Sequence, residues 1–413
     1  MLNGGGREST PGSMHLLCVI DSVIKNGAER SLAALIPHYV ESGLVVDVAY
    51  FHDRPGLQNE IRDAGASLFC LDRRQGRVGW LLQTRGLIRE RRPDLVHTTL
   101  FEADIAGRIA GKLNRVPVVS SFVGLNDGSY RNDPLLTSVK IRSAQLVDAA
   151  TARLVTRFHA LSAFVADKMS HVLHVPRARI DVIPRGRDPQ SLGTRSAERV
   201  AQVRTTLGLD PSQPIVLAVA RHDHRKGLDV LLEALPPVLA QVPGVRLLVA
   251  GAESSQTERL RAAASDLRLV EAVRFLGPRD DVPDLLCLAD VFVMPSRSEG
   301  LNGSLLEAMA LEAPIVATNI PPVREVMGGE DGALLVRPAD AASLAGGILR
   351  ALADPKGARS RAVVARRRFL SNYTIDRVAR RMLEFFERAL ADSGREQKGN
   401  GDLHRPAHKR GLA

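Results

Sequence analysis

The sequence predicts a two-domain α/β protein built around two parallel β-sheets. Its 413 residues are more than one ordinary hydrophobic core serves. Short apolar runs alternate with amphipathic segments along most of the chain, a pattern typical of parallel sheets covered by helices on both faces. A stretch rich in proline, glycine, serine and charge, residues 184–214, separates two sets of these units and predicts a hinge. We therefore expect a first domain over residues 14–190 and a second over 191–373.

The strands are predicted from short apolar runs between turn signals. In the first domain we expect strands at His15–Ile20, Val45–Tyr50, Ser67–Leu71, Leu95–Thr98, Val116–Ser121, Phe158–Leu161 and Ile180–Ile183. In the second domain we expect them at Ile215–Ala220, Arg246–Ala250, Val273–Leu276, Val291–Met294, Ile315–Ala317 and Leu334–Val336. Ligands in such sheets bind at the carboxyl ends of the strands, so the loops after these strands are the first places to search.

Helices are predicted between the strands, for example at Ala28–Ser42 and Ala103–Lys112. Two more follow Leu352, one over Arg361–Leu370 and one from Thr374 to about Ala391. The polar ends of the chain, residues 1–13 and 393–413, are expected to be disordered, and the second of them is basic.

Composition favours a cytoplasmic location. No apolar run approaches the length that spans a bilayer, and no signal peptide is visible. The three cysteines, Cys18, Cys70 and Cys287, lie in or beside apolar runs and are predicted to be buried free thiols in a reducing compartment.

The net charge of +10 is concentrated in the first half of the chain, where part of it forms one cluster of arginines. The cluster consists of Arg73, Arg74, Arg77, Arg85, Arg89, Arg91 and Arg92. It favours an anionic partner, and we expect peripheral attachment to the inner face of an anionic membrane; a solvated helix face is the alternative. Nucleic acid is disfavoured as a partner, because aromatic residues make up only 4% of the chain.

The loop Arg221–Gly227 is the first candidate for chemistry. It follows a predicted strand and precedes a helix whose free N–H groups and dipole favour anions. Arg221 offers a planar fork of donors and Lys226 a compact charge, a suitable pair for a diphosphate, and Gly227 allows close backbone approach. An exposed basic turn is the alternative.

The loop and helix start at Ser298–Ala310 form the second candidate. Two carboxylates, Glu299 and Glu307, suit sugar and ribose hydroxyls, and the glycines between them suit phosphate or hydroxyl oxygens. For Glu307 the alternative is a capping box, with Ser304 as the N-cap and Glu307 at the third helical position.

A third candidate, Lys25–Ser31, is a loop that enters a long helix and contains Gly27; a plain helix cap is the alternative. Other motifs are absent from the sequence: the glycine fingerprint of dinucleotide-binding domains, the phosphate loop, the zinc-protease motif and an Asp-x-Asp pair. His97, His159 and His222 are scattered and are predicted to be structural. We therefore expect no metal and no cofactor.

Taken together, these residues resemble glycosyltransferase family four from about Met14 to Ala391. The most specific part is Leu288–Ser296 followed by Glu299 and Glu307. Supporting parts are Asn26–Arg30, Val182–Asp188, and Arg221 with Lys226. The resemblance implies a GT-B fold, in which two Rossmann-like domains face each other across a cleft and the last helix crosses back onto the first domain.

The resemblance also implies a retaining transfer of sugar from a nucleotide-diphosphate-sugar to a hydroxyl of a glycan or a lipid-linked glycan. Arg221 and Lys226 would hold the diphosphate, and Glu299 would meet the sugar hydroxyls. The remaining donor-binding roles fall to Gly300, Leu301, Asn302 and Gly303 beside the sugar, Glu307 at the ribose, Gly277 and Arg279 by the base, and Gly27 at the cleft floor.

The sequence departs from the usual family pattern at several positions. Val123 stands near the place of a common histidine, and Pro321-Pro322 replaces the usual glycine pair. Glu312 replaces a common glycine, and Arg185 replaces the familiar asparagine of the hinge motif. We therefore assign no catalytic histidine. An epimerase or phosphorylase of the same fold and a non-catalytic anion-binding protein remain alternatives.

Overall fold

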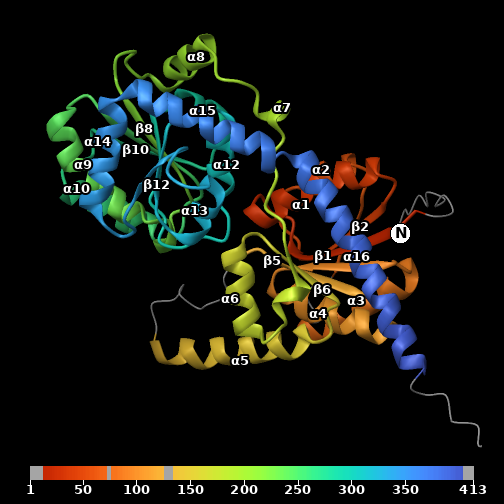
Figure 1. Ribbon diagram of the computed structural model, residues 1–413. Helices are drawn as coiled ribbons and strands as arrows, with labels where there is room; N and C mark the ends of the chain where they lie inside the picture. The colour runs from red at the N-terminus through yellow and green to blue at the C-terminus, as the bar shows by residue number, and fades with distance from the viewer. Residues whose placement is uncertain (1–12, 72–75, 125–133, 403–413) are drawn as a thin grey trace, which may run out of the picture.

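The computed structural model of the protein describes residues 13–71, 76–124 and 134–402, and these form two parallel sheets (Figure 1). The first sheet has the strand order β3-β2-β1-β4-β5-β6-β7. Its strands are β1 (His15–Ser22), β2 (Val45–His52), β3 (Ser67–Cys70), β4 (Leu95–Thr99), β5 (Val118–Phe122), β6 (Arg157–Ala160) and β7 (Ile180–Val182). Its helices are α1 (Gly27–Glu41), α2 (Gln58–Asp63), α3 (Gly76–Arg91), α4 (Phe101–Asn114), α5 (Pro134–Ala152) and α6 (Ala163–Leu173), with the 3-10 turn η2 (Arg177–Arg179).

The second sheet has the order β10-β9-β8-β11-β12-β13. Its strands are β8 (Ile215–Val219), β9 (Arg246–Ala250), β10 (Val273–Gly277), β11 (Val291–Met294), β12 (Ile315–Thr318) and β13 (Leu334–Val336). Its helices are α7 (Pro189–Leu192), α8 (Ala197–Leu207), α9 (Leu228–Gln241), α10 (Thr257–Asp266), α11 (Val282–Leu288), α12 (Gly303–Ala310), α13 (Pro321–Met327), α14 (Ala341–Ala353) and α15 (Pro355–Asn372), with the 3-10 turn η3 (His224–Lys226).

Alternating strand residues bury on opposite faces of the first sheet, as a two-residue side-chain period requires. Leu16, Cys18 and Ile20 pack with α1 on one face, whereas Leu17 and Val19 pack with α3 and α4 on the other. β3 lies at the edge of the sheet, and Cys70 at its end is exposed, which corrects the expectation that all three cysteines are buried.

The last helix, α16 (Ile375–Asp402), leaves the second domain and packs on the first (Figure 1). Its Phe386 is buried in the same core as the β1 side chains and meets Tyr39 of α1 edge-on, with ring centroids 5.6 Å apart. Residues 393–402, expected in a disordered tail, continue this helix, whereas residues 403–413 and 1–12 lie outside the described part of the chain.

The crossing between the two domains is shorter than the predicted hinge. Within residues 184–214 the chain forms α7 and α8, whose Leu192, Val203 and Leu207 bury in the core of the second domain. The outward crossing between the sheets is therefore limited to residues 183–188, because the apolar residues that follow pack into the core of the second domain.

This outward crossing is hydrogen-bonded to the return crossing. Arg187 N donates to Tyr373 O at 2.9 Å, and Ile375 N donates to Arg187 O at 2.9 Å. A Cβ atom at Gly186 would lie 2.7 Å from the Cα atom of Ile375, so this close approach requires glycine. The two domains are thus joined by paired backbone segments.

A buried hydrogen-bond chain leads to this crossing from the first sheet. His159 Nε2 donates to Ile183 O at 2.7 Å, so its Nδ1 accepts from Ser121 Oγ at 2.8 Å, and His97 Nε2 donates to the same hydroxyl at 2.7 Å. Both imidazoles are neutral at pH 7, because burial holds the pKa of each below that of a free imidazole. Burial lowers the pKa of His97 to about 3 and that of His159 to about 4.

Acid should weaken the fold through these two neutral histidines. The pKa values of both histidines are lower in the folded than in the unfolded chain, so as the pH falls below about 6.5 the unfolded chain binds protons that the folded chain does not. The free energy of unfolding therefore falls as the pH drops toward 4, by up to about 1.4 kcal/mol per pH unit for each histidine. His97→Gln removes one of them, so the difference in unfolding free energy between wild type and variant should narrow over this range. Urea titrations at several pH values measure this difference. A difference that stays constant with pH would contradict the prediction.

Candidate active site

The two loops of the second domain that the sequence singled out lie side by side. Residues 221–227 follow β8 and residues 295–302 follow β11, and these strands pair directly, with Val291 beside Val216 and Phe292 beside Leu217. Because the strands are parallel, both loops leave the same edge of the sheet. This edge is the carboxyl edge at which α/β proteins bind ligands.

Lys226 and Glu299 form the centre of the site. Lys226 Nζ lies 2.7 Å from Glu299 Oε1 and 2.9 Å from Oε2. Glu299 is 6% exposed, and Oε1 also accepts from Ser296 Oγ at 2.8 Å and from Asn302 Nδ2 at 3.0 Å. These contacts fix the carboxylate in one orientation while Lys226 remains partly accessible at 17%.

The Glu299 carboxylate is ionised at neutral pH in spite of its burial. Burial acts to raise its pKa, but the Lys226 charge and the hydrogen bonds from Lys226, Ser296 and Asn302 outweigh burial, so the pKa lies below its ordinary value. The site therefore holds an acceptor-only carboxylate beside a cation, a combination suited to binding hydroxyl groups next to an anion.

The Lys226 loop is fitted closely against the end of β11. Asp223 caps the turn η3 by accepting from Arg225 N at 2.9 Å. Gly227 has φ +65°, and a Cβ atom there would lie 2.0 Å from Pro295 O. The glycine is needed both for its left-handed backbone and for this close packing.

Arg221 lies at the outer side of this loop. Its Nη2 is 3.0 Å from Asp223 Oδ2, and its side chain is 44% exposed. The guanidinium therefore remains reachable by an anion from solvent, and the structure shows no hydrogen bond or ion pair from Arg221 to Lys226 or Glu299 among the described residues.

The capping-box alternative for Glu307 is wrong. The N-cap of α12 is Asn302, whose Oδ1 accepts from Ser304 N at 2.9 Å. The helix therefore begins at Gly303, and Ser304, the predicted N-cap, lies inside its first turn. Glu307 Oε1 instead accepts from Arg187 Nε at 2.6 Å, across 120 positions of sequence. Arg187 lies against Gly303, where a Cβ atom would be 2.0 Å from Nη2.

The loop after Glu299 touches the first domain. A Cβ atom at Gly300 would lie 3.0 Å from Val123 O, and Leu301 O accepts from Arg185 Nη1 at 3.1 Å. On the first domain, Gly27 begins α1 and lies under the same guanidinium, since a Cβ atom there would be 2.8 Å from Arg185 Nη1. Gly27, Gly300 and Leu301 are thus brought together around Arg185.

The predicted base-side residues lie on another part of the domain interface. Gly277 ends β10 with φ +67°, and Arg279 is held by Asp281, with Nε 2.7 Å from Oδ1. The next residue, Asp280, lies 3.6 Å from both Lys25 Nζ and Arg30 Nη2 of the first domain. The loop 277–281 therefore faces the start of α1.

Sequence reasoning gave no role to three polar residues of this site, although all three stood within the segments that carried the family resemblance. Ser296 could have been found, because it follows the strand and stands three residues before Glu299. Arg187 stood in Val182–Asp188 as support for the family resemblance without a role of its own, and Arg185, in the same segment, was also noted as a departure from the family pattern. Their importance depends on contacts made across more than a hundred positions of sequence.

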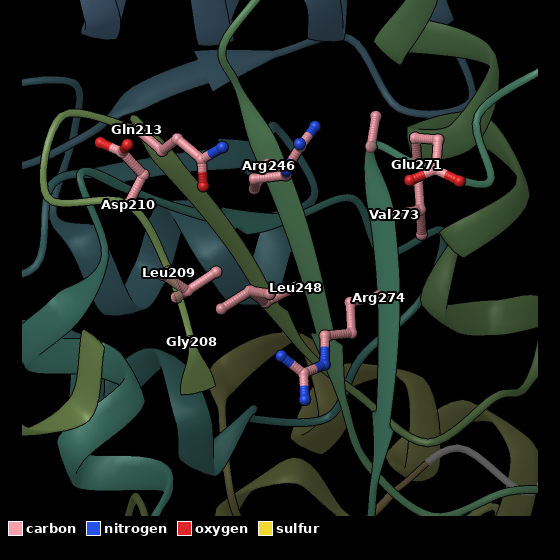
Figure 2. Close-up of a pocket in the computed structure, with 10 residues that line it drawn as sticks. Gly208, Leu209, Asp210, Gln213, Arg246, Leu248, Glu271, Val273 and Arg274 are labelled. Carbon is pink, nitrogen blue, oxygen red and sulfur yellow. The ribbon is translucent and has the colours of Figure 1, made fainter. Parts of the chain in front are cut away.

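A separate cavity of about 290 Å³ opens at the amino ends of β9 and β10 (Figure 2). It is lined in part by Arg246, Leu248, Val273, Arg274 and Asp210. Its mouth is at the opposite end of the strands from Lys226, so we give it no part in this site. Among the described residues, no group of three or more histidine, cysteine, aspartate or glutamate side chains is placed to hold a metal.

Comparison with known proteins matches both halves of the chain. Residues 25–191 match the family model described as Glycosyltransferase Family 4, and residues 213–354 match the model described as Glycosyl transferases group 1. The 2-deoxystreptamine N-acetyl-D-glucosaminyltransferase of Streptomyces fradiae is 30% identical over 355 residues, which cover 82% of this chain and 83% of that protein. The glycogen synthase of Mycobacterium tuberculosis is 30% identical over 306 residues, 73% of this chain and 70% of that protein.

Solved structures agree in fold. The Anabaena HepE protein in complex with UDP-glucose superposes with a TM-score of 0.80 at 20% sequence identity, over 91% of this chain and 99% of that one. With the two parallel sheets described above, this likeness confirms the predicted GT-B fold.

Replacing Gly227 tests how tightly the Lys226 loop is fitted. Gly227→Ala should lower the free energy of unfolding by at least about 2 kcal/mol, because the added methyl meets a carbonyl oxygen as well as an unfavourable φ. Gly208→Ala is the matched control: φ is +62° but no atom lies within 4 Å, so about 1 kcal/mol is expected. Denaturant titration measures both, and equal costs would contradict the close fit.

Proposed function

The chain belongs to glycosyltransferase family 4, and we propose that it transfers a sugar from a nucleotide-diphosphate-sugar to an acceptor hydroxyl with retention of configuration. The observation that carries the proposal is the Lys226–Glu299 pair at the carboxyl edge of the second sheet. In this pair, a cation that would bind a diphosphate is hydrogen-bonded directly to a carboxylate that would bind sugar hydroxyls.

A nucleotide-sugar donor is supported by fold neighbours that were crystallised with UDP or UDP-glucose. In this chain, Arg221 and Lys226 would bind the diphosphate, and Glu299 would accept from the sugar hydroxyls beside Gly300, Leu301, Asn302 and Gly303. Glu307 would bind the ribose. Its present partner Arg187 would then share the carboxylate, which has two oxygens, with the ribose hydroxyls.

The proposed reaction depends on charge stabilisation. Cleavage of the bond between sugar and phosphate leaves negative charge on the departing diphosphate, and Lys226 is already held where that charge would develop. Such a preplaced donor contributes on the order of 3 kcal/mol to transition-state stabilisation. Val123 offers no base at the place of the usual histidine. We therefore propose that the leaving phosphate takes the proton of the acceptor hydroxyl, whose oxygen attacks the sugar from the face that the phosphate leaves.

We further propose a glycan or lipid-linked glycan acceptor that is reached from an anionic membrane surface on the cytoplasmic side. Helix α3 supports this: its Val78 and Leu82, one turn apart, are 69% and 57% exposed, and Arg77 and Arg89 lie exposed on the same helix. An apolar strip beside cations suits the headgroup region of anionic lipid. No helix in the described ranges has both the length and the hydropathy to cross a bilayer.

Not every arginine of the sequence cluster is available for this surface. Arg91 is bound to Asp47, with Nε 2.7 Å from Oδ2, and Arg73 and Arg74 lie outside the described residues. The cations that remain exposed on or just after α3 are Arg77, Arg89 and Arg92.

Donor identity and stereochemistry test the central proposal. A panel of nucleotide-sugars is scanned by thermal shift, and the product made from the stabilising donor is examined by NMR for its anomeric configuration. Net transfer with retention supports the proposal. Donor turnover without any acceptor product would favour an epimerase or phosphorylase, and the absence of nucleotide-sugar binding would favour an anion-binding protein.

Lys226→Ala should lower turnover at saturating donor by at least about tenfold, because the charge on the leaving diphosphate loses its partner. Initial rates of transfer measure the effect, and circular dichroism checks the fold. Lys356→Ala, at an exposed position of α15, is the control and should leave the rate unchanged. Normal turnover of the Lys226 variant would remove this residue from the mechanism.

The double change Val78→Ser and Leu82→Ser should lower partitioning onto anionic vesicles by about tenfold, because each change withdraws two or three apolar carbons from the headgroup region. Sedimentation with phosphatidylserine vesicles at low and high salt measures it. Val270→Ser, which is 63% exposed on the second domain, is the matched control. Equal partitioning onto neutral vesicles, or equal binding by the double variant, would contradict attachment through α3.

A further inference from the structure

The outward crossing between the domains carries two arginines that contact the loops and helix starts facing it. Arg185 and Arg187 flank Gly186, whose backbone packs against the return crossing at Ile375. Both guanidinium groups therefore come from the outward segment that connects the two sheets. The two arginines differ in whether a carboxylate is paired with the guanidinium.

Most cations of the cleft already have a carboxylate. Lys226 is paired with Glu299 at 2.7 Å, and Arg187 with Glu307 at 2.6 Å. Arg185 has no carboxylate within salt-bridge distance among the residues that the structure describes. Its Nη1 donates to a backbone carbonyl, that of Leu301, and its Nε is buried without a partner.

Arg185 is only partly buried, but its Nε is fully buried and unpaired, and such an arrangement is more favourable when an anion completes it. Burial, together with the nearby charge of Arg187, lowers the pKa of Arg185 to about 10, so the group is still charged at neutral pH. The carboxylates whose charge acts on it, Glu299 and Glu29, form no salt bridge with it and lie on opposite domains. Glu29 is itself occupied by Ser22 Oγ at 2.9 Å.

The surroundings of Arg185 suit an oxyanion. Its guanidinium lies on Gly27, the first residue of α1, and the side chain of the N-cap residue Asn26 does not cap a backbone N–H group of the helix. The amino end of this 15-residue helix, whose dipole favours anions, therefore lies beside the guanidinium, although the Glu29 carboxylate already accepts from its own backbone N–H. Leu301, the partner of Nη1, is two residues from Glu299.

We infer that Arg185 is a ligand of the donor diphosphate supplied by the interdomain crossing, and that it binds the phosphate attached to the sugar from the side opposite Lys226. This inference rests on the proposed function and extends its donor site to a residue outside both sheets. Because the crossing is hydrogen-bonded to residues 373–375, a diphosphate held by Arg185 also ties the donor to both connections between the domains.

A purely structural role makes a different prediction. If Arg185 only joins Gly27 to Leu301, its loss lowers stability and weakens every nucleotide to the same extent. If it binds the sugar-linked phosphate, its loss weakens nucleoside diphosphates selectively, since a nucleoside monophosphate lacks that phosphate.

Titration calorimetry with matched pairs, UDP with UMP, GDP with GMP and ADP with AMP, separates these roles. For the pair that the wild type binds, Arg185→Asn should raise the Kd of the diphosphate by about tenfold or more and that of the monophosphate by less than about threefold. Arg177→Asn, at a partly exposed arginine paired with Asp167, is the control and should change neither.

Gly27→Ala serves as a second variant, because a methyl group there would displace the Arg185 guanidinium without removing its charge. The same selective loss of diphosphate affinity is expected, and thermal melting confirms that both variants fold. An equal loss for both members of a pair, or no loss, would overturn the role of Arg185. A wild type that binds none of the six nucleotides would instead overturn the proposed function itself.

Discussion

The paired crossing of the chain between the two sheets is the constraint on which the site depends. Backbone hydrogen bonds between Arg187 and residues 373 and 375 hold the outward and return segments together, and Gly186 lets them approach. Two hydrogen-bonded segments resist twisting more than one would, so they hold the facing loops of the two domains in register. The Gly300 loop can therefore meet Val123, and Arg185 can meet Gly27, across a cleft between separate cores.

The electrostatics of the cleft follow from this arrangement. Lys226 and Arg187 are held by the carboxylates of Glu299 and Glu307, which would serve hydroxyl groups, so in these two pairs neither charge is left unpaired. Glu299 remains ionised because Lys226 and two neutral donors offset its burial. Binding a donor with both hydroxyls and phosphates would exchange these partners rather than require new charges, which keeps the side chains close to their working positions.

Much of the fold could be predicted from the sequence. The apolar runs gave the strands of both sheets in their correct places, because fully buried parallel strands have a short, strongly apolar signature. The loops at 221–227 and 299–303 could be brought together as well, since they leave the carboxyl ends of strands in the same sheet. The errors lay where local signals competed: α12 is capped by Asn302 instead of Ser304, and α7 and α8 occupy a segment that was expected to be a hinge.

By itself the sequence determined the two α/β sheets, the position of the loops and the residue types available for a diphosphate and a sugar. Only the tertiary structure decided which charges meet. Glu307 finds Arg187 across 120 positions, Glu299 finds Lys226 across 73, and Arg185 finds a carbonyl instead of a carboxylate. The physical reason is that strand and helix periods are encoded by near neighbours, whereas the partner and burial of a charged side chain depend on how distant segments pack around it.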